Sequence, residues 1–80
     1  MITPSQSRAA RGLLEWSQQQ LAEAASVGLS TIRGFESGTR QPIANNLTAI
    51  RTALEAAGVQ FIDAGDVPEG SGVVLRDRTS

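Results

Sequence analysis

The side chains with the clearest chemical potential in this sequence are its arginines. Seven of the 80 residues are basic, and every one of them is arginine. A guanidinium group presents a rigid fork of N–H donors that suits phosphate oxygens and the edges of bases. Residues 1–58 hold five arginines and four glutamates, a net charge of +1, whereas residues 59–80 hold two arginines and four acids, a net charge of −2. An ordinary solvated surface explains this composition equally well, so the positions of the arginines must decide between the two interpretations.

Other reactive side chains are missing. The sequence has no cysteine, which excludes disulfides and thiolate metal sites and is typical of a cytoplasmic protein. It has no histidine either, so the usual general base, metal ligand and pH switch are absent. We therefore expect no enzymatic activity, no metal and no cofactor. No apolar run approaches the ~20 residues that cross a bilayer, so we also expect a soluble cytoplasmic protein without a membrane partner.

Capping boxes predict the first two helices. In such a box a Ser or Thr cap is followed three residues later by Glu or Gln. Thr3 and Gln6 form the first box, and the helix after it is expected to run to about Glu15. Ser17 and Gln20 form the second. Helical spacing of apolar residues predicts buried faces made of Ala9, Ala10, Leu13 and Leu14 in the first helix and Leu21, Ala22 and Ala25 in the second.

A third helix is predicted to begin after Gly28 and to end at Ser37-Gly38. Ile32 and Phe35, three residues apart, are expected to face the core. At ~100° per residue, the opposite face comprises Ser30, Gly34 and Ser37, flanked by Leu29 and Arg33.

A fourth helix follows a polar loop. We expect Asn45 or Asn46 to cap it and Gly58 to close it. Its predicted apolar stripe consists of Leu47, Ile50, Leu54 and Ala57.

The tail changes from helical to strand periodicity. "VQFID" and "GVVLR" flank a turn-rich segment and predict an antiparallel hairpin. A lone hairpin is marginal in water, so it must either cover the helical core or pair with another chain. Its apolar residues are Val59, Phe61, Ile62, Val73, Val74 and Leu75, and the last four residues, "DRTS", are expected to fray. Residues 1–58 thus form the predicted helical domain, and residues 59–80 a β-hairpin tail that is a candidate dimerisation element.

Two short helices joined by a tight turn, the second with a polar outer face, match the helix-turn-helix plan for entering a major groove. Periodicity alone does not establish that plan, because any small helical bundle shows it. The stretch "WSQQQLAEAASVGLSTIRGFESG" resembles the phage-repressor (Cro/cI, XRE) helix-turn-helix family. The matching residues are Ser17, Gln18, Leu21, Ala22, Val27, Thr31, Ile32, Phe35, Glu36 and Gly38. The resemblance covers residues 5–58 and implies a mainly α fold: a compact four- to five-helix repressor-like helix-turn-helix domain, here with a short C-terminal β-hairpin.

The resemblance also implies contacts with DNA phosphates. The matching positions are Arg11, Ser17, Gln18, Thr39, Arg40, Gln41, Asn45 and Asn46. Arg11 and Glu36 further match a pair that ties the first helix to the end of the third. An exposed glutamine without a capping role has little structural purpose, which favours a phosphate contact for Gln18. Capping alone would explain Ser17 and one of the two asparagines.

The base-facing positions implied by the resemblance are Gly28, Leu29, Ser30, Arg33 and Gly34. Arg33 could bind guanine O6 and N7, Ser30 could bond several base edges, and Leu29 could pack on a thymine methyl. Gly34 stands where the family often has a long polar side chain, and here it would let the backbone approach the groove. The alternatives are a half-buried Leu29, a solvated Ser30 and an Arg33 paired with an acid.

These residues predict a sequence-specific DNA-binding transcriptional regulator, a repressor or dual regulator whose partner is a double-stranded operator. With ~4–6 phosphate contacts one subunit would bind weakly, so we expect a homodimer on a palindrome. The alternative is a helix-turn-helix module that masks a regulatory protein partner, as antiactivators and antitoxins do. A net charge of −1 and two glycines on the third helix fit that alternative.

Overall fold

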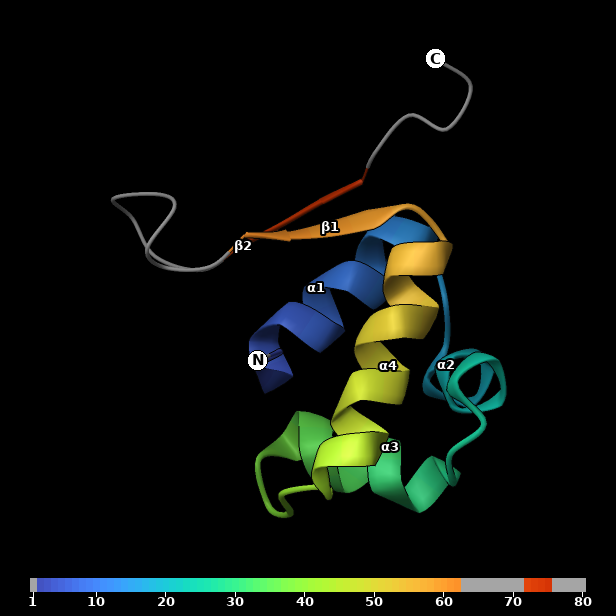
Figure 1. The fold of residues 1–80 in the computed structure, drawn as a ribbon, viewed down its shortest axis with the longest axis vertical. Coiled ribbons are helices and arrows are strands. Elements are labelled where there is room, and N and C mark those ends of the chain that lie inside the picture. The colour runs from blue at the N-terminus through green and yellow to red at the C-terminus, as the bar shows by residue number, and fades with distance from the viewer. Residues whose placement is uncertain (1, 63–71, 76–80) are drawn as a thin grey trace.

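The computed structural model describes residues 2–62 and 72–75. The elements follow in the order α1 (Pro4–Leu14), α2 (Gln18–Ala25), α3 (Leu29–Ser37), α4 (Ala44–Ala56), β1 (Val59–Ile62) and β2 (Gly72–Leu75). Figure 1 shows α3 at the end of the molecule opposite the two strands. The predicted mainly helical fold, with four helices and a C-terminal hairpin in the described residues, is confirmed.

Both predicted capping boxes are present. Oγ1 of Thr3 accepts from the backbone N–H of Gln6 at 3.2 Å, and Oε1 of Gln6 accepts from the N–H of Thr3 at 3.0 Å. Ser17 and Gln20 repeat this exchange at 3.1 and 2.7 Å. Glu15 ends α1 in the left-handed conformation, with φ of 57°. The chain therefore turns directly from α1 into α2.

Both ends of α3 lie where the sequence predicts them. Gly28 is the N-cap and makes no side-chain capping bond. Gly38 adopts φ of 80° at the C-cap, a left-handed conformation that glycine takes without steric cost. This turn sends the chain back along the outer side of α3.

The start of α4 differs from the prediction. Its N-cap is Ile43, and neither Asn45 nor Asn46 caps the helix. The carbonyl of Ile43 accepts from the N–H groups of Asn46 and Leu47 at 3.0 and 3.1 Å. Backbone bonding thus starts the helix at Ala44, and both asparagines lie within its first turn. A cap at either asparagine would break these bonds.

The core lies between the four helices. Its fully buried large side chains include Leu21, Ile32, Phe35, Ile50 and Leu54. Burying one such side chain contributes about 1.5–3 kcal/mol. The inward faces predicted for α2, α3 and α4 are confirmed at these positions.

The face of α1 was predicted only in part. Ala10 is fully buried and Leu14 is half-buried, but Ala9 is exposed and Leu13 is 43% exposed. Ser7 is buried instead. The rotation of α1 is set by polar contacts with α3, described below, that apolar periodicity does not reveal.

The hairpin packs on the helices. β1 and β2 are antiparallel, with Val59 opposite Leu75 and Ile62 opposite Gly72. β1 contacts α4 and β2 contacts α1. Val59 is 2% exposed and Phe61 is 8% exposed, so both belong to the core. Burial of these two residues agrees with the alternative in which the hairpin covers the helical core, whereas pairing of the hairpin with another chain stays a prediction.

Some expectations fall outside the described part of the chain. They concern the turn-rich segment 63–71, the last residues 76–80, and the side chains of Ile62, Val73, Val74 and Leu75. Within the described residues, none of the helices is both long enough and apolar enough to cross a bilayer.

Candidate nucleic-acid interface

A buried carboxylate joins the three helices around the candidate site. The Glu36 side chain, near the end of α3, is 2% exposed. Its Oε1 accepts from Nη2 of Arg11 at 2.8 Å and from Nε2 of Gln18 at 3.1 Å. Its Oε2 accepts from Oγ of Ser7 at 2.6 Å and from Nε of Arg11 at 2.9 Å. The predicted tie between Arg11 and Glu36 is confirmed, and it extends to α2 through Gln18.

Two arginines of α1 extend this network through backbone carbonyls. Nη1 of Arg11 donates to the carbonyl of Trp16 at 3.0 Å, which holds the link between α1 and α2. Nη1 of Arg8 donates to the carbonyl of Glu36. The contribution of Arg8 was not predicted, because nothing local in the sequence relates it to a backbone group 28 positions away. Both arginines therefore help to fix the orientation of α3.

The surroundings of Glu36 favour its ionised form. Burial by itself raises the pKa of this carboxyl. Hydrogen bonds from Arg11, Ser7 and Gln18, together with the charge of Arg11, outweigh burial and leave the pKa below its ordinary value of 4.5. At neutral pH the group is a carboxylate whose charge is balanced inside the fold, so it adds little repulsion toward an anion outside.

The start of α2 also faces the site. Ser17 is the N-cap of α2, which confirms one of its two predicted roles. Gln18 is half-buried and donates to Glu36, so the premise that it is exposed and structurally idle is wrong. Its contact with a phosphate stays a prediction. Unpaired N–H groups in the first turn of a helix suit an anion at this position.

The outer face of α3 carries the predicted base-facing residues. Ser30 and Arg33 are exposed, and Gly28 is exposed at the N-cap. Leu29 is half-buried against the core, which matches the structural alternative for this residue. Among the described residues Arg33 forms no ion pair with an acid. Its guanidinium is thus available to a partner outside the chain.

Gly34 has an unexpected neighbour. A Cβ placed on Gly34 would lie 2.9 Å from Cβ of Arg40. The Arg40 stem therefore covers the part of α3 that was predicted to admit close approach of the backbone to a groove. Contact between residues six positions apart around a helix end depends on the turn at Gly38, and sequence periodicity does not reveal it.

The other predicted phosphate-contacting residues lie in the loop that follows α3 and in the first turn of α4. Thr39, Arg40 and Gln41 are exposed in the loop that follows it. Oγ1 of Thr39 lies 2.8 Å from Oγ of Ser37 and forms a hydrogen bond with it. In the first turn of α4, Asn45 is exposed, whereas its neighbour Asn46 is half-buried.

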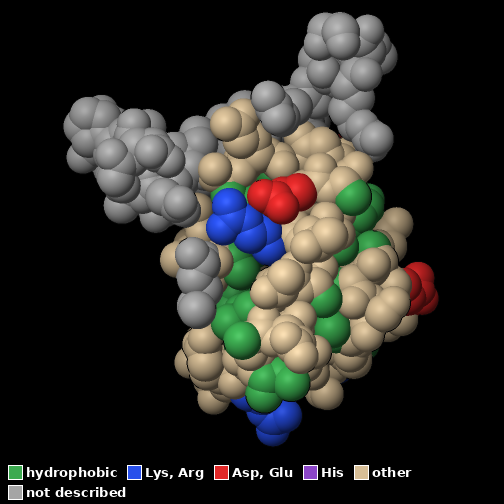
Figure 2. All heavy atoms as spheres, in the orientation of Figure 1, with side chains coloured by type: hydrophobic (Ala, Val, Ile, Leu, Met, Phe, Trp, Pro, Cys, Tyr) green, Lys and Arg blue, Asp and Glu red, His purple; other side chains and the backbone are tan. Residues whose placement is uncertain are grey.

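The exposed charges on α3 and on the loop after it are all positive. From Ala24 to Leu54 the only acid is Glu36, which is buried, and the exposed charged residues are Arg33 and Arg40. Figure 2 shows a basic group at the end of the molecule where Figure 1 places α3, with no acidic side chain beside it in that view. The exposed surface of α3 and its loop is thus suited to a polyanion.

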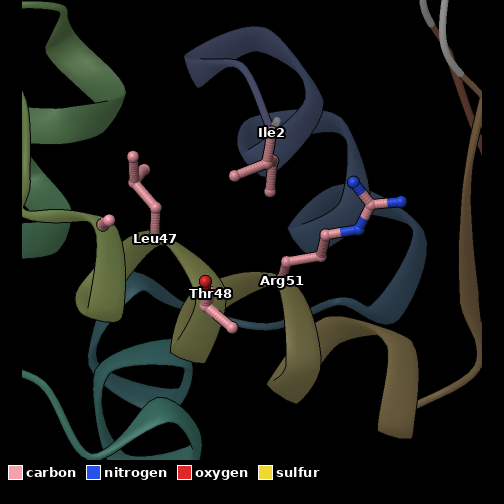
Figure 3. A pocket seen from close by; sticks show the side chains of 5 residues that line it. Ile2, Leu47, Thr48 and Arg51 are labelled. Atoms are coloured by element: carbon pink, nitrogen blue, oxygen red, sulfur yellow. The ribbon is translucent and has the colours of Figure 1, made fainter.

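A separate pocket lies between the start of α1 and α4. It has a volume of about 210 Å³ and is lined by Ile2, Ala44, Leu47, Thr48 and Arg51 (Figure 3). The guanidinium of Arg51 donates to Glu55 at 3.1 Å and lies 5.3 Å from the centre of the Phe61 ring. Unlike Arg33 and Arg40, this arginine is engaged within the fold.

The geometry defines a helix-turn-helix protein, in which α2 supports α3 and α3 presents its polar face. A family model described as helix-turn-helix matches residues 8–57. The match covers more than half of the chain, and the chain belongs to this family in its phage-repressor (Cro/cI, XRE) form. A search of curated proteins finds no match. The family consists of DNA-binding transcriptional regulators that are typically not enzymes.

Proposed function

We propose that this chain binds a palindromic operator in double-stranded DNA as a homodimer and acts in the cytoplasm as a repressor or dual regulator. The observation that carries the proposal is the exposed surface of α3 and its loop, where Arg33 and Arg40 are the charged residues and Glu36 is buried. Such a surface attracts the phosphate backbone, which supplies most of the non-specific affinity of DNA-binding proteins.

In this proposal α3 lies in the major groove as the recognition helix. The residues facing bases are Gly28, Leu29, Ser30, Arg33 and Gly34. The strongest discrimination comes from Arg33, because its exposed fork can donate two hydrogen bonds to a guanine. The contacts of α1 and α2 with Glu36 support this role, since they hold α3 at a fixed angle before DNA binds.

The proposed phosphate contacts come from α1, the start of α2, the loop after α3 and the first turn of α4. They comprise Arg11, Ser17, Gln18, Thr39, Arg40, Gln41, Asn45 and Asn46. Most of these side chains are exposed, and Arg11 keeps 19% of its side chain exposed while paired with Glu36. Phosphate contacts set the register of the protein on the duplex, while base contacts supply its sequence preference.

Dimerisation follows from the small number of contacts that one subunit can make. About 4–6 phosphate contacts bind weakly at physiological salt, and two subunits on half-sites one helical turn apart would combine their affinities. In the proposal the outer edge of the two-stranded sheet pairs with its symmetry mate. The edges of such a sheet carry unpaired backbone groups.

Selection of bound DNA from a random pool, followed by gel shift, tests this function. We expect Arg33→Ala and Arg40→Ala each to weaken binding about fivefold or more, because each removes an exposed fork. Arg51→Ala is the matched control, since it removes the same charge from an arginine engaged elsewhere, and it should change affinity less than about twofold. A wild-type protein that retards no DNA even at low salt would refute the proposal and favour the protein-masking alternative.

A further inference from the structure

The stem of the Arg40 side chain packs against α3 at Gly34. A Cβ built on Gly34 would lie 2.9 Å from Cβ, 3.7 Å from Cγ and 3.6 Å from Cδ of Arg40. Three successive carbons of the stem therefore follow the surface that a side chain at position 34 would otherwise occupy. Only glycine leaves room for this contact.

The backbone holds Arg40 in this place. The carbonyl of Gly34 accepts from the N–H groups of Thr39 and Arg40 at 3.0 and 3.1 Å. It also accepts from Oγ of Ser37 at 3.1 Å. The left-handed turn at Gly38 makes these bonds possible. The base of the Arg40 side chain is thus attached to α3 through the main chain and through its own stem.

The guanidinium at the end of this stem is available. Arg40 is exposed, and it forms no hydrogen bond or ion pair through its side chain with any described residue. The nearest acid along the chain, Glu36, is occupied by Arg11, Ser7 and Gln18. A fork on a packed stem loses less conformational freedom on binding than a free side chain does.

We propose that Arg40 is a specificity-determining residue that contacts a guanine edge in the major groove, with Gly34 as the residue that positions it. This inference rests on the proposed function and changes one assignment within it, because Arg40 then contacts a base instead of a phosphate. The outer face of α3 is the surface that would enter the groove, and the Arg40 stem lies on that face. A loop residue thereby supplies the long polar side chain that position 34 lacks.

Two substitutions separate charge from geometry. Arg40→Lys keeps the positive charge but loses the planar fork that matches guanine O6 and N7. Gly34→Ala keeps Arg40 but would place a methyl group 2.9 Å from its Cβ, an atom that moves only with the backbone, so the loop at Arg40 must shift together with its stem. Alanine is the better helix former, but a shift of the Arg40 backbone costs stability, so circular dichroism checks the fold of this variant before selection. Arg40→Lys tests the inference without any change at position 34.

The experiment selects DNA from a random pool with the wild type, Arg40→Lys, Arg40→Ala and Gly34→Ala, and with Arg33→Ala as a reference. We expect the three changes at positions 34 and 40 to weaken the same base-pair preference in each half-site by about tenfold. Arg33→Ala should weaken the preference at a different base pair of the half-site. Arg40→Lys should keep the dependence of affinity on salt.

Other results would overturn the inference. Arg40 is only a phosphate contact if Arg40→Ala lowers the affinity for all DNA sequences equally and Arg40→Lys restores it. The slope of log affinity against log salt concentration would then fall by about one in Arg40→Ala. A Gly34→Ala profile identical to the wild type would remove the positioning role and the geometric basis of the inference. If the wild type itself enriches no sequence and shifts no DNA at low salt, the proposed function fails as well.

Discussion

At the scale of single residues, Glu36 is the side chain on which the arrangement of the first three helices depends. One carboxylate accepts hydrogen bonds from Ser7, Arg11 and Gln18. Removing the charge of a buried ion pair leaves its partner uncompensated and typically costs about 3–5 kcal/mol. We therefore regard Glu36 as a structural support of the interface rather than a DNA contact.

The pKa of Glu36 gives this support a pH dependence. Because the folded-state pKa lies below the ordinary value of 4.5, the ionised group stabilises the fold above pH 4.5. That stabilisation is lost as the pH falls through the folded pKa. We expect the free energy of unfolding of the wild type to exceed that of Glu36→Gln at pH 7, and the difference to shrink toward pH 3. Urea titrations across this range measure it, and a difference that is constant with pH would contradict the assignment.

At the scale of elements, helix starts of two kinds occur in the same chain. Ser17 caps α2 through its side chain, whereas α4 starts from the backbone carbonyl of Ile43 and leaves Asn45 exposed. We expect Ser17→Ala to lower the free energy of unfolding by about 0.5–2 kcal/mol. Asn45→Ala should change it by less than about 0.5 kcal/mol.

Urea denaturation of the two alanine variants compares these helix starts directly. An equal loss of stability would mean that Asn45 does cap α4. DNA affinity gives a second measurement, since a loss of affinity in Asn45→Ala with unchanged stability supports the proposed phosphate contact.

At the scale of the whole molecule, the first strand of the hairpin belongs to the core of the single chain. Phe61 is buried and lies under the guanidinium of Arg51. We expect Phe61→Ala to cost about 3–5 kcal/mol, because it leaves a cavity between the hairpin and the helices. Thermal unfolding followed by circular dichroism measures this loss. A change below about 1 kcal/mol would mean that the hairpin contributes little to the core.

The proposed dimer makes a separate prediction at the same scale. Subunits that associate only when folded make the unfolding midpoint rise with protein concentration. We expect such a rise for the wild type over a hundredfold range of concentration, together with a dimeric mass by light scattering. A midpoint independent of concentration and a monomeric mass would refute the homodimer while leaving DNA binding by a monomer open.

The sequence by itself determined the elements whose signals are local. Thr3 and Ser17 with their partners three residues later predicted two helix starts, and Gly38 predicted a helix end. These signals suffice because a cap and a turn involve atoms only a few residues apart. The apolar positions of α2, α3 and α4 were predicted for the same reason, since helical spacing alone sets which residues share a face.

Only the tertiary structure decided how those elements meet. The rotation of α1 depends on Ser7 and Arg11 contacting Glu36, and these residues are 29 and 25 positions apart from it. Gln18 joins the same carboxylate from α2. The stem of Arg40 covers Gly34 because the turn at Gly38 folds the chain back. Periodicity predicts which side of a helix is apolar, but a polar contact between helices requires two specific atoms at one point in space, and that condition exists only in the folded chain.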